Sequence, residues 1–314
     1  MKNGFLITDN LKNKKEYDGN TFKFGITVDK EDYIAKFAKD SLSSLYSEYV
    51  ASNFSCNLGI PCQEVYLGTY NRQLAVIIKD FATKDSKLRS YKSTQQSSED
   101  IDIENKNYTY QDVLDMIQKH TKMSNKYKQQ AIKLFWLMFI CDAILGNRDR
   151  HHGNWGYLKE KPSYRPAPIY DNGASLFPDV ERNIDRYKML VQQNKEFEFI
   201  AERSEKFPAS VFQMERADGK IKKTNYYEIL SDLRVNKILA QEVRYFREKI
   251  GFSRIYEAIF RSVYSADTII PYYYKRFYIM VTCVRYLHMI ERKDLKTAYK
   301  ITKQKFDSDV RLLR

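Results

Sequence analysis

The sequence predicts an α+β chain of two lobes, a small mixed α/β N-terminal lobe followed by a larger and mostly helical C-terminal lobe. Short alternating or apolar runs typical of strands, DYIAKF and QLAVIIKDF, occur in the first quarter of the chain. A polar stretch over residues 83–107 then interrupts the composition, and beyond it apolar residues recur mainly at helical spacing. We therefore expect an N-lobe over residues 1–82, a polar surface excursion over 83–107 and a C-lobe over 108–314.

The N-lobe combines strands with one helix. DYIAKF alternates as a short strand and contains Lys36, while SLYSEYVASNF has helical spacing and contains Glu48. QLAVIIKDF is typical of a buried strand that ends in charged residues, where the chain would pass between the lobes. On this interpretation Lys79 and Phe81 lie at the connection between the lobes, although Phe81 would fit equally well in a core.

The C-lobe begins with the helical pattern YTYQDVLDMIQKH, and its apolar run over residues 131–145 predicts a buried helix. Further helical periods cover residues 226–233, 235–250, 253–264 and 268–292. The lysine-rich last stretch, KDLKTAYKITKQKFDSDVRLLR, predicts one more helix. This helix would either bind a partner or pack on the C-lobe, and we favour packing.

The most informative pattern lies in residues 144–177, which read ILGNRDRHHGNW and then PIYDNGASLF. Asp149 lies five residues before Asn154, the spacing with which one loop holds a carboxylate base and a metal-binding amide. Asp171 follows an apolar run, so a short hairpin would return it to the same ion. Mg²⁺ prefers carboxylate and amide oxygens together with phosphate oxygens. The pattern therefore predicts phosphoryl transfer, because turn preferences would explain one Asp–Asn pair but not the second Asp.

Two adjacent histidines, His151 and His152, follow Asp149. A zinc site is disfavoured, because adjacent side chains point in different directions and no cysteine lies nearby in the sequence. We expect His151 to hold the loop in shape or to assist proton transfer near neutral pH.

Phosphoryl transfer also needs positive and backbone N–H groups at the nucleotide phosphates. We expect Lys36 to supply the charge with Glu48 as its partner, although each residue alone would be an ordinary solvated charge. The segment YDGNTFKFGIT is the candidate phosphate-covering loop, although a plain hairpin turn would explain its first glycine almost as well. The candidate contacts in this loop are Gly19, Asn20, Thr21 and Lys23. Backbone groups near Lys79 and Phe81 would contact the adenine.

The composition bounds the remaining possibilities. The net charge of +13 fits nucleic acid, an acidic membrane or an acidic protein partner, but lysine is spread along the chain and no nucleic-acid-binding motif accompanies it. We therefore expect a general basic surface and no specific nucleic-acid site. The four cysteines lie in or beside apolar runs, which favours buried free thiols. Because neither a signal peptide nor a transmembrane stretch is evident, we expect a cytoplasmic protein; secretion as an effector without a cleavable signal stays open.

The motif N-R-D-R-H-x-x-N followed by Y-D-N-G resembles the HipA-like serine/threonine kinases, in their compact CtkA-like branch. SEYVAS, the turn at residues 58–61 and YLGTY support the resemblance. It implies a bilobal protein-kinase-like fold, the cofactors ATP and Mg²⁺, and transfer to protein hydroxyls. The implied site residues are Lys36 for the nucleotide phosphates, Glu48 as its partner, Asp149 as catalytic base, and Asn154 and Asp171 on Mg²⁺.

The resemblance also bears on regulation and partners. Many family members autophosphorylate a serine of the phosphate loop, and at that place this chain offers Thr21 and no serine. HipA toxins act with an antitoxin, so the candidate partners are an antitoxin or another acidic protein.

Two alternatives differ in class. D-R-H-x-x-N also resembles phosphoinositide kinases, and a basic surface would suit an anionic lipid, but Asp171 is followed by Asn-Gly rather than Phe-Gly. A pseudokinase or interaction scaffold would keep the fold without turnover. The joint presence of Lys36, Asp149, Asn154 and Asp171 argues against it.

Overall fold

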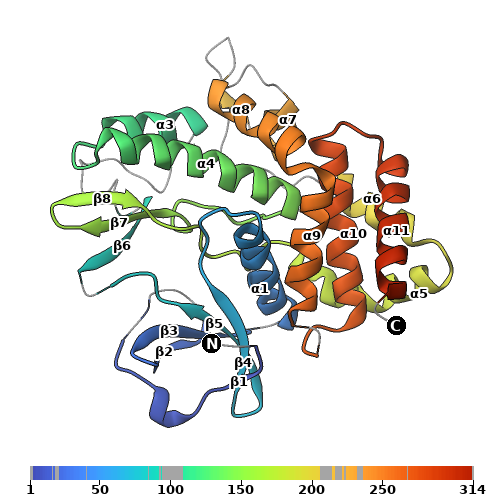
Figure 1. Cartoon of the computed structure of the whole chain (residues 1–314), viewed down its shortest axis with the longest axis horizontal. Coiled ribbons are helices and arrows are strands. Elements are labelled where there is room, and N and C mark those ends of the chain that lie inside the picture. Colours follow the sequence, from blue (N-terminus) through green and yellow to red (C-terminus); the bar gives the residue numbers. More distant parts are fainter. Residues whose placement is uncertain are drawn as a thin grey trace.

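The structure is a computed structural model. It describes residues 3–15, 17, 21–39, 41–83, 85–91, 93, 109–205, 214–215, 221–222, 224–231, 236–266 and 268–312. Figure 1 shows a sheet-containing lobe with the N-terminus and, above and to the right of it, a larger lobe of helices. The predicted arrangement of a small mixed lobe and a larger helical lobe is confirmed.

The N-lobe is built on a five-stranded sheet with the order β1-β4-β5-β3-β2. Its strands are β1 (Phe5–Leu6), β2 (Lys23–Val28), β3 (Glu31–Phe37), β4 (Val65–Tyr70) and β5 (Gln73–Lys79). The short 3-10 helix η1 (Asp9–Leu11) precedes β2. All neighbours are antiparallel except β1 and β4. The pairing aligns Lys36 with Val76 on one side and with Lys23 on the other.

Alternation in β3 explains how the sheet presents its lysine. Tyr33, Ala35 and Phe37 are buried in a small apolar cluster on one face of the sheet. Because successive side chains of a strand point to opposite faces, Lys36 lies on the other face. That face is the one that packs toward the main core, where Val76 and other N-lobe residues join the C-lobe cluster.

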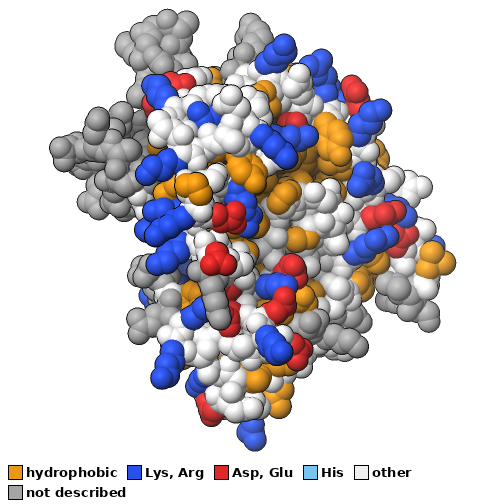
Figure 2. Space-filling view, turned by 60° about the vertical axis from the view of Figure 1, so that its left-hand side comes forward, with side chains coloured by type: hydrophobic (Ala, Val, Ile, Leu, Met, Phe, Trp, Pro, Cys, Tyr) orange, Lys and Arg blue, Asp and Glu red, His pale blue; other side chains and the backbone are white. Residues whose placement is uncertain are grey.

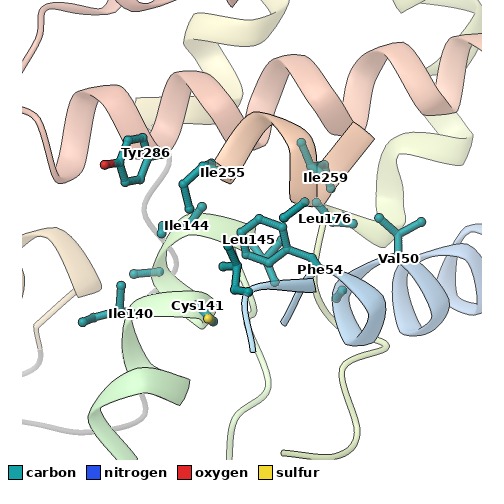
Figure 3. Close-up of a cluster of buried hydrophobic side chains, with 14 of the residues drawn as sticks. Val50, Phe54, Ile140, Cys141, Ile144, Leu145, Leu176, Ile255, Ile259 and Tyr286 are labelled. Atoms are coloured by element: carbon teal, nitrogen blue, oxygen red, sulfur yellow. The ribbon is translucent and has the colours of Figure 1, made fainter. Parts of the chain in front are cut away.

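Helix α1 (Leu42–Asn57) connects the two lobes. It contacts both the N-lobe sheet and helix α9 (Gly251–Tyr264) of the C-lobe. Figure 3 shows Val50 and Phe54 of α1 beside Ile255 and Ile259 of α9 in one apolar cluster. The helix that carries Glu48 is therefore fixed to the C-lobe by continuous packing.

Helices make up most of the C-lobe. They are α3 (Tyr110–Lys119), α4 (Asn125–Leu145), α5 (Ile184–Gln192), α6 (Glu196–Glu205), α7 (Tyr226–Ser231), α8 (Lys237–Tyr245), α9, α10 (Tyr272–Met289) and α11 (Leu295–Leu312), with the short helices η2 (Pro178–Asn183) and η3 (Phe246–Ile250, a π-helix). Two strands of two residues each, β9 (Met214–Glu215) and β10 (Ile221–Lys222), pair antiparallel. The predicted buried helix over residues 131–145 is confirmed as part of α4. The C-terminal helix packs against α10 and α6, with Ala298 and Phe306 buried.

A three-stranded sheet, β6-β7-β8, lies beside α4. It consists of β6 (Ser86–Ser90), β7 (Gly156–Glu160) and β8 (Ser163–Pro166). We expected residues 83–107 to form a polar surface excursion, yet the described part of that stretch contributes β6. This mostly polar strand pairs with β7, and the buried ring of Tyr91 stacks on Trp155 at 4.3 Å between centroids. Residues 84, 92 and 94–107 lie outside the described residues.

The composition led to expectations about the cysteines, the surface charge and membrane-spanning segments. All four cysteines are free thiols, and Cys141 and Cys283 are buried while Cys56 and Cys62 are partly exposed. Lys and Arg side chains are spread from top to bottom of the face in Figure 2, with Asp and Glu between them. In the parts of the chain that are described, no helix is long and apolar enough to span a membrane.

Candidate active site

A cavity of about 380 Å³ lies between the N-lobe sheet, α1 and the loops that follow α4 and β8. It brings together five of the residues singled out in the sequence, which are Thr21, Lys36, Asp149, Asn154 and Asp171. Its remaining lining residues are Phe37, Lys39, Ser41, Ser44, Leu45, Gly173, Ala174 and Pro178. Segments far apart in the sequence therefore meet at one cavity.

Lys36 forms the expected ion pair with Glu48. Its Nζ lies 2.8 Å from Glu48 Oε2 and 3.2 Å from Asp171 Oδ1. Glu48 is only 1% exposed, so its negative charge acts on the ammonium group with little screening. The charge of Glu48 raises the pKa of Lys36, against the opposing effect of burial, and Asp171 adds to the increase. Lys36 therefore stays protonated at physiological pH.

Asp171 carries an ionised carboxylate into the same cavity. It lies beyond β8 and has a left-handed backbone with φ of 57°, a conformation that Asp tolerates better than most residues. Partial burial raises the pKa of Asp171, but the positive charges of Lys36 and Arg150 outweigh it and hold the pKa below its usual value. The side chain of Asp171 is 40% exposed, so its anionic oxygens are accessible to a cation.

The loop that carries Asp149 and Asn154 begins where α4 ends. Gly146 has a left-handed φ of 69° and terminates the helix, a conformation that glycine adopts without strain. Asn147 then stabilises the turn, since its Oδ1 accepts the N–H of Asp149 at 3.0 Å. Asn154 Nδ2 donates to the carbonyl of Asp149 at 2.7 Å, which leaves the amide oxygen of Asn154 without a hydrogen bond to any described residue.

His151 shapes this loop. Its Nδ1 accepts the N–H of Gly153 at 2.9 Å, so in the neutral ring the proton is on Nε2. That Nε2 lies 3.9 Å from Asp149 Oδ2, which is too long for a direct hydrogen bond. His152 points elsewhere, with its ring 5.7 Å from that of Tyr91. Among the described residues no group of three or more His, Cys, Asp or Glu side chains is arranged to hold a metal.

Sequence reasoning missed Arg150, which organises the loop from behind. Arg150 is fully buried, and two of its nitrogens lie 2.8 and 3.0 Å from the carboxylate oxygens of Asp142 in α4. It also donates to the carbonyl of Asn154 at 2.8 Å and to Asn172 Oδ1 at 2.6 Å. A signal existed in the sequence: Asp142 is an acid inside an apolar helical run, and a buried acid needs a partner.

Glu48 belongs to a second buried group of contacts. Gln63 Nε2 lies 2.5 Å from Glu48 Oε1, and the backbone N–H of Asn172 donates to the same oxygen at 2.8 Å. The side chain of Asn172 donates to Ser52 Oγ at 2.9 Å. A Cβ at Gly173 would lie 3.1 Å from Glu48 Oε2, so the glycine after Asn172 permits this close approach.

Two of the four phosphate-loop candidates, Thr21 and Lys23, belong to the described residues. Thr21 lines the cavity, and Lys23 faces Lys36 across the β2–β3 pair. Gly19 and Asn20 lie outside the described residues.

Both candidates at the connection between the lobes, Lys79 and Phe81, lie outside the lining of this cavity. Lys79 Nζ pairs with Glu31 at 2.8 Å, and the backbone N–H of Lys79 donates to the carbonyl of Glu64. Phe81 packs on Tyr170 at 5.9 Å between ring centroids and joins a small apolar cluster with Leu158.

Comparison with known proteins gives the family. Residues 10–241 match the HipA-like C-terminal domain. The serine/threonine-protein kinase CtkA of Helicobacter pylori strain J99 is 31% identical over 257 residues, which is 78% of this chain and 75% of that protein. The chain belongs to the HipA-like family. Its relationship to CtkA confirms the predicted enzyme class, a serine/threonine protein kinase.

Solved structures agree with this assignment. The crystal structure of a Helicobacter pylori proinflammatory kinase CtkA is similar with a TM-score of 0.69 and 26% identity, covering 90% of this chain and 94% of that one. HipA of Shewanella oneidensis MR-1, solved with HipB and operator DNA, has a TM-score of 0.53 at 12% identity over 94% of this chain and 69% of that one. The second similarity concerns the fold alone. The predicted bilobal kinase-like fold is thus confirmed.

Proposed function

We propose that this HipA-like kinase transfers the γ-phosphate of ATP to a serine or threonine hydroxyl of a protein, in a reaction that depends on Mg²⁺. The proposal rests on one observation: a single cavity is lined by Lys36, Asp149, Asn154 and Asp171. Phosphoryl transfer is catalysed mainly by positioning and by stabilisation of charge, and these side chains supply both. Lys36 binds the nucleotide phosphates, because Glu48 keeps it charged and fixes its direction.

The donor set fits Mg²⁺. Asp171 offers an ionised carboxylate and Asn154 an amide oxygen that no described residue uses, while nucleotide phosphates and water would complete an all-oxygen shell. When bound, the ion neutralises charge on the phosphate oxygens. We assign Asn154 and Asp171 as its protein ligands.

Asp149 is the proposed base. Its side chain is 63% exposed and lines the cavity, so it can accept a proton from an incoming hydroxyl. His151 keeps the loop in place through its bond to Gly153, and its Nε2–H faces the Asp149 carboxylate. Phe81 and backbone groups near Lys79 are the proposed contacts of the adenine.

We also propose that the protein phosphorylates itself. Thr21 is a hydroxyl that lines the same cavity as Asp149 and Asp171, which supports it as one acceptor. The antitoxin and acidic-protein partners remain predictions.

The deciding experiment incubates the purified protein with γ-labelled ATP and Mg²⁺, alone and with a generic basic protein, beside the Asp149→Asn variant. We expect label on serine or threonine, mapped by mass spectrometry, and a loss of at least about 100-fold in the variant. Because Asp149 is not proposed to hold the nucleotide, binding of a fluorescent ATP analogue should be retained in that variant.

Asp171→Asn is the matched comparison, since it changes one carboxylate of the same cavity to the same amide. It should lose transfer and Mg²⁺-dependent nucleotide binding together. Equal losses of binding in both variants would contradict the separate roles. Label that enters phosphoinositide vesicles but no protein would favour the lipid-kinase alternative, and ATP binding without any transfer would favour a pseudokinase.

A further inference from the structure

The pairing of β3 indicates how a bound nucleotide would lie along the cavity. Tyr33, near the start of the strand, pairs with Lys79 beside the connection between the lobes, whereas Lys36 lies nearer the strand's end. A nucleotide with its adenine at that connection and its phosphates at Lys36 therefore runs parallel to β3. Lys39 lies three residues beyond Lys36, up to about 10 Å farther along an extended chain.

The cavity continues past the phosphate lysine. Glu48, the partner of Lys36, lies in the second turn of α1, while Ser44 and Ser41 line the cavity toward the beginning of that helix. At 1.5 Å of rise per residue, Ser41 is about 10 Å from Glu48 along the helix axis. Pro178 of η2 lines the same end of the cavity. This end is the one at which an acceptor hydroxyl would approach the γ-phosphate.

Lys39 is the cation of this acceptor end that lacks an ion pair within the described part of the chain. Lys36, by contrast, is held by both Glu48 and Asp171. Glu181 of η2 lies near the beginning of α1 but does not pair with Lys39. Its carboxylate instead accepts hydrogen bonds from Ser41 Oγ and from the N–H of Ser43. The exposed side chain of Lys39 therefore lines the same cavity as the carboxylates of Asp149 and Asp171, without an ion pair to any described residue.

We propose that Lys39 forms an acceptor subsite for a carboxylate, so that the enzyme prefers a serine or threonine flanked by Asp or Glu. The inference rests on the proposed function, since it names the acceptor of that reaction. A flanking carboxylate would complement the exposed ammonium group of Lys39, and because solvent screens an exposed charge the preference should be modest. A flanking lysine would meet a like charge there.

The test uses two peptides of equal length that differ only in the residues flanking one serine, Glu in the first and Lys in the second. Wild-type protein should give a kcat/KM roughly threefold to tenfold higher for the Glu peptide, an advantage that falls as salt is added. Lys39→Glu should reverse the preference, and its KM for ATP should remain that of the wild type.

Lys30→Glu is the control. Lys30 is exposed in the turn before β3, so this substitution makes the same change of charge at the opposite end of the strand. It should leave the preference intact. A preference unchanged by Lys39→Glu, or an increase in the KM for ATP with both peptides, would overturn the subsite and leave the kinase assignment untouched. Absence of transfer to either peptide and to the protein itself would overturn the proposed function, and the subsite with it.

Discussion

The back and the front of the cavity are built differently. Behind it, Arg150 is 0% and Glu48 1% exposed, and each makes several hydrogen bonds to other segments. In front, Asp149 is 63% exposed and Lys39 has no ion pair with a described residue. The buried groups hold the loops in position, while the groups that we propose to contact substrates are left accessible. This division suits a reaction that depends on positioning.

The largest expected effect comes from breaking the back of the cavity. Arg150→Met keeps much of the side-chain length but leaves Asp142 buried without its cation, which should lower the free energy of unfolding by about 3–5 kcal/mol. Urea denaturation followed by circular dichroism measures the change. Arg148→Met is the control, because Arg148 is 45% exposed where it pairs with Asp179, and it should cost about 1 kcal/mol or less. Similar losses in the two variants would contradict the contrast between back and front.

Lys36 tests the boundary between the two regions, because the buried Glu48 holds it and we propose that it binds the nucleotide phosphates in the cavity. Lys36→Ala should reduce kcat for transfer by about 100-fold or more, since a charge fixed at the phosphates acts chiefly in the transition state. Steady-state kinetics with saturating ATP measures the loss. Lys87→Ala, at an exposed position of β6, should have near wild-type activity. Activity within about twofold of wild type in Lys36→Ala would remove Lys36 from the site.

The pH dependence of nucleotide binding tests how Glu48, at the back of the cavity, controls the charge of Lys36. The pKa of Lys36 is raised chiefly by the charge of Glu48, so the stabilisation from this pair is complete below the unfolded pKa of about 10.5 and is lost as pH rises through the higher folded value. In Glu48→Gln the pKa of Lys36 falls, and binding of an ATP analogue should be lost at a lower pH than in wild type. A fluorescence titration from about pH 8 to about pH 11 measures the shift.

Glu31→Gln is the matched control for that titration, because Glu31 pairs with Lys79 outside the cavity lining. It should leave the pH dependence of binding where it is in wild type. Coinciding curves for wild type and Glu48→Gln would mean that the Lys36–Glu48 pair does not govern nucleotide binding.

How far the site could be predicted depends on how far apart its partners lie in the sequence. The strand pattern around Lys36 and the helical pattern around Glu48 are local and could be predicted, whereas their ion pair was expected only because the pattern around Asp149 indicated phosphoryl transfer. The meeting of Asp149, Asn154 and Asp171 in one cavity also followed from spacing, because a hairpin of β7 and β8 separates the two loops.

The parts that escaped prediction rest on long-range packing. Gln63 reaches Glu48, and Asn172 reaches both Arg150 and Ser52, only because α1 packs between the lobes. Asp142 indicates that a buried cation is needed, but nothing in the residues beside Arg150 identifies it as that cation, because its burial comes from the fold. Strand β6 was missed for a similar reason: its polar sequence becomes a strand only through pairing with β7.

The smallest expected effect is at the proposed adenine contact, where packing rather than charge would hold the nucleotide. Phe81 presents its ring beside Tyr170, and Phe81→Ala removes that apolar surface. We expect the KM for ATP to rise roughly threefold to tenfold with kcat nearly unchanged, because the contact is the same in the ground and transition states. Phe81→Leu, which keeps most of the apolar area, should restore binding. If kcat fell while the KM stayed constant, Phe81 would act through the fold and would not contact adenine.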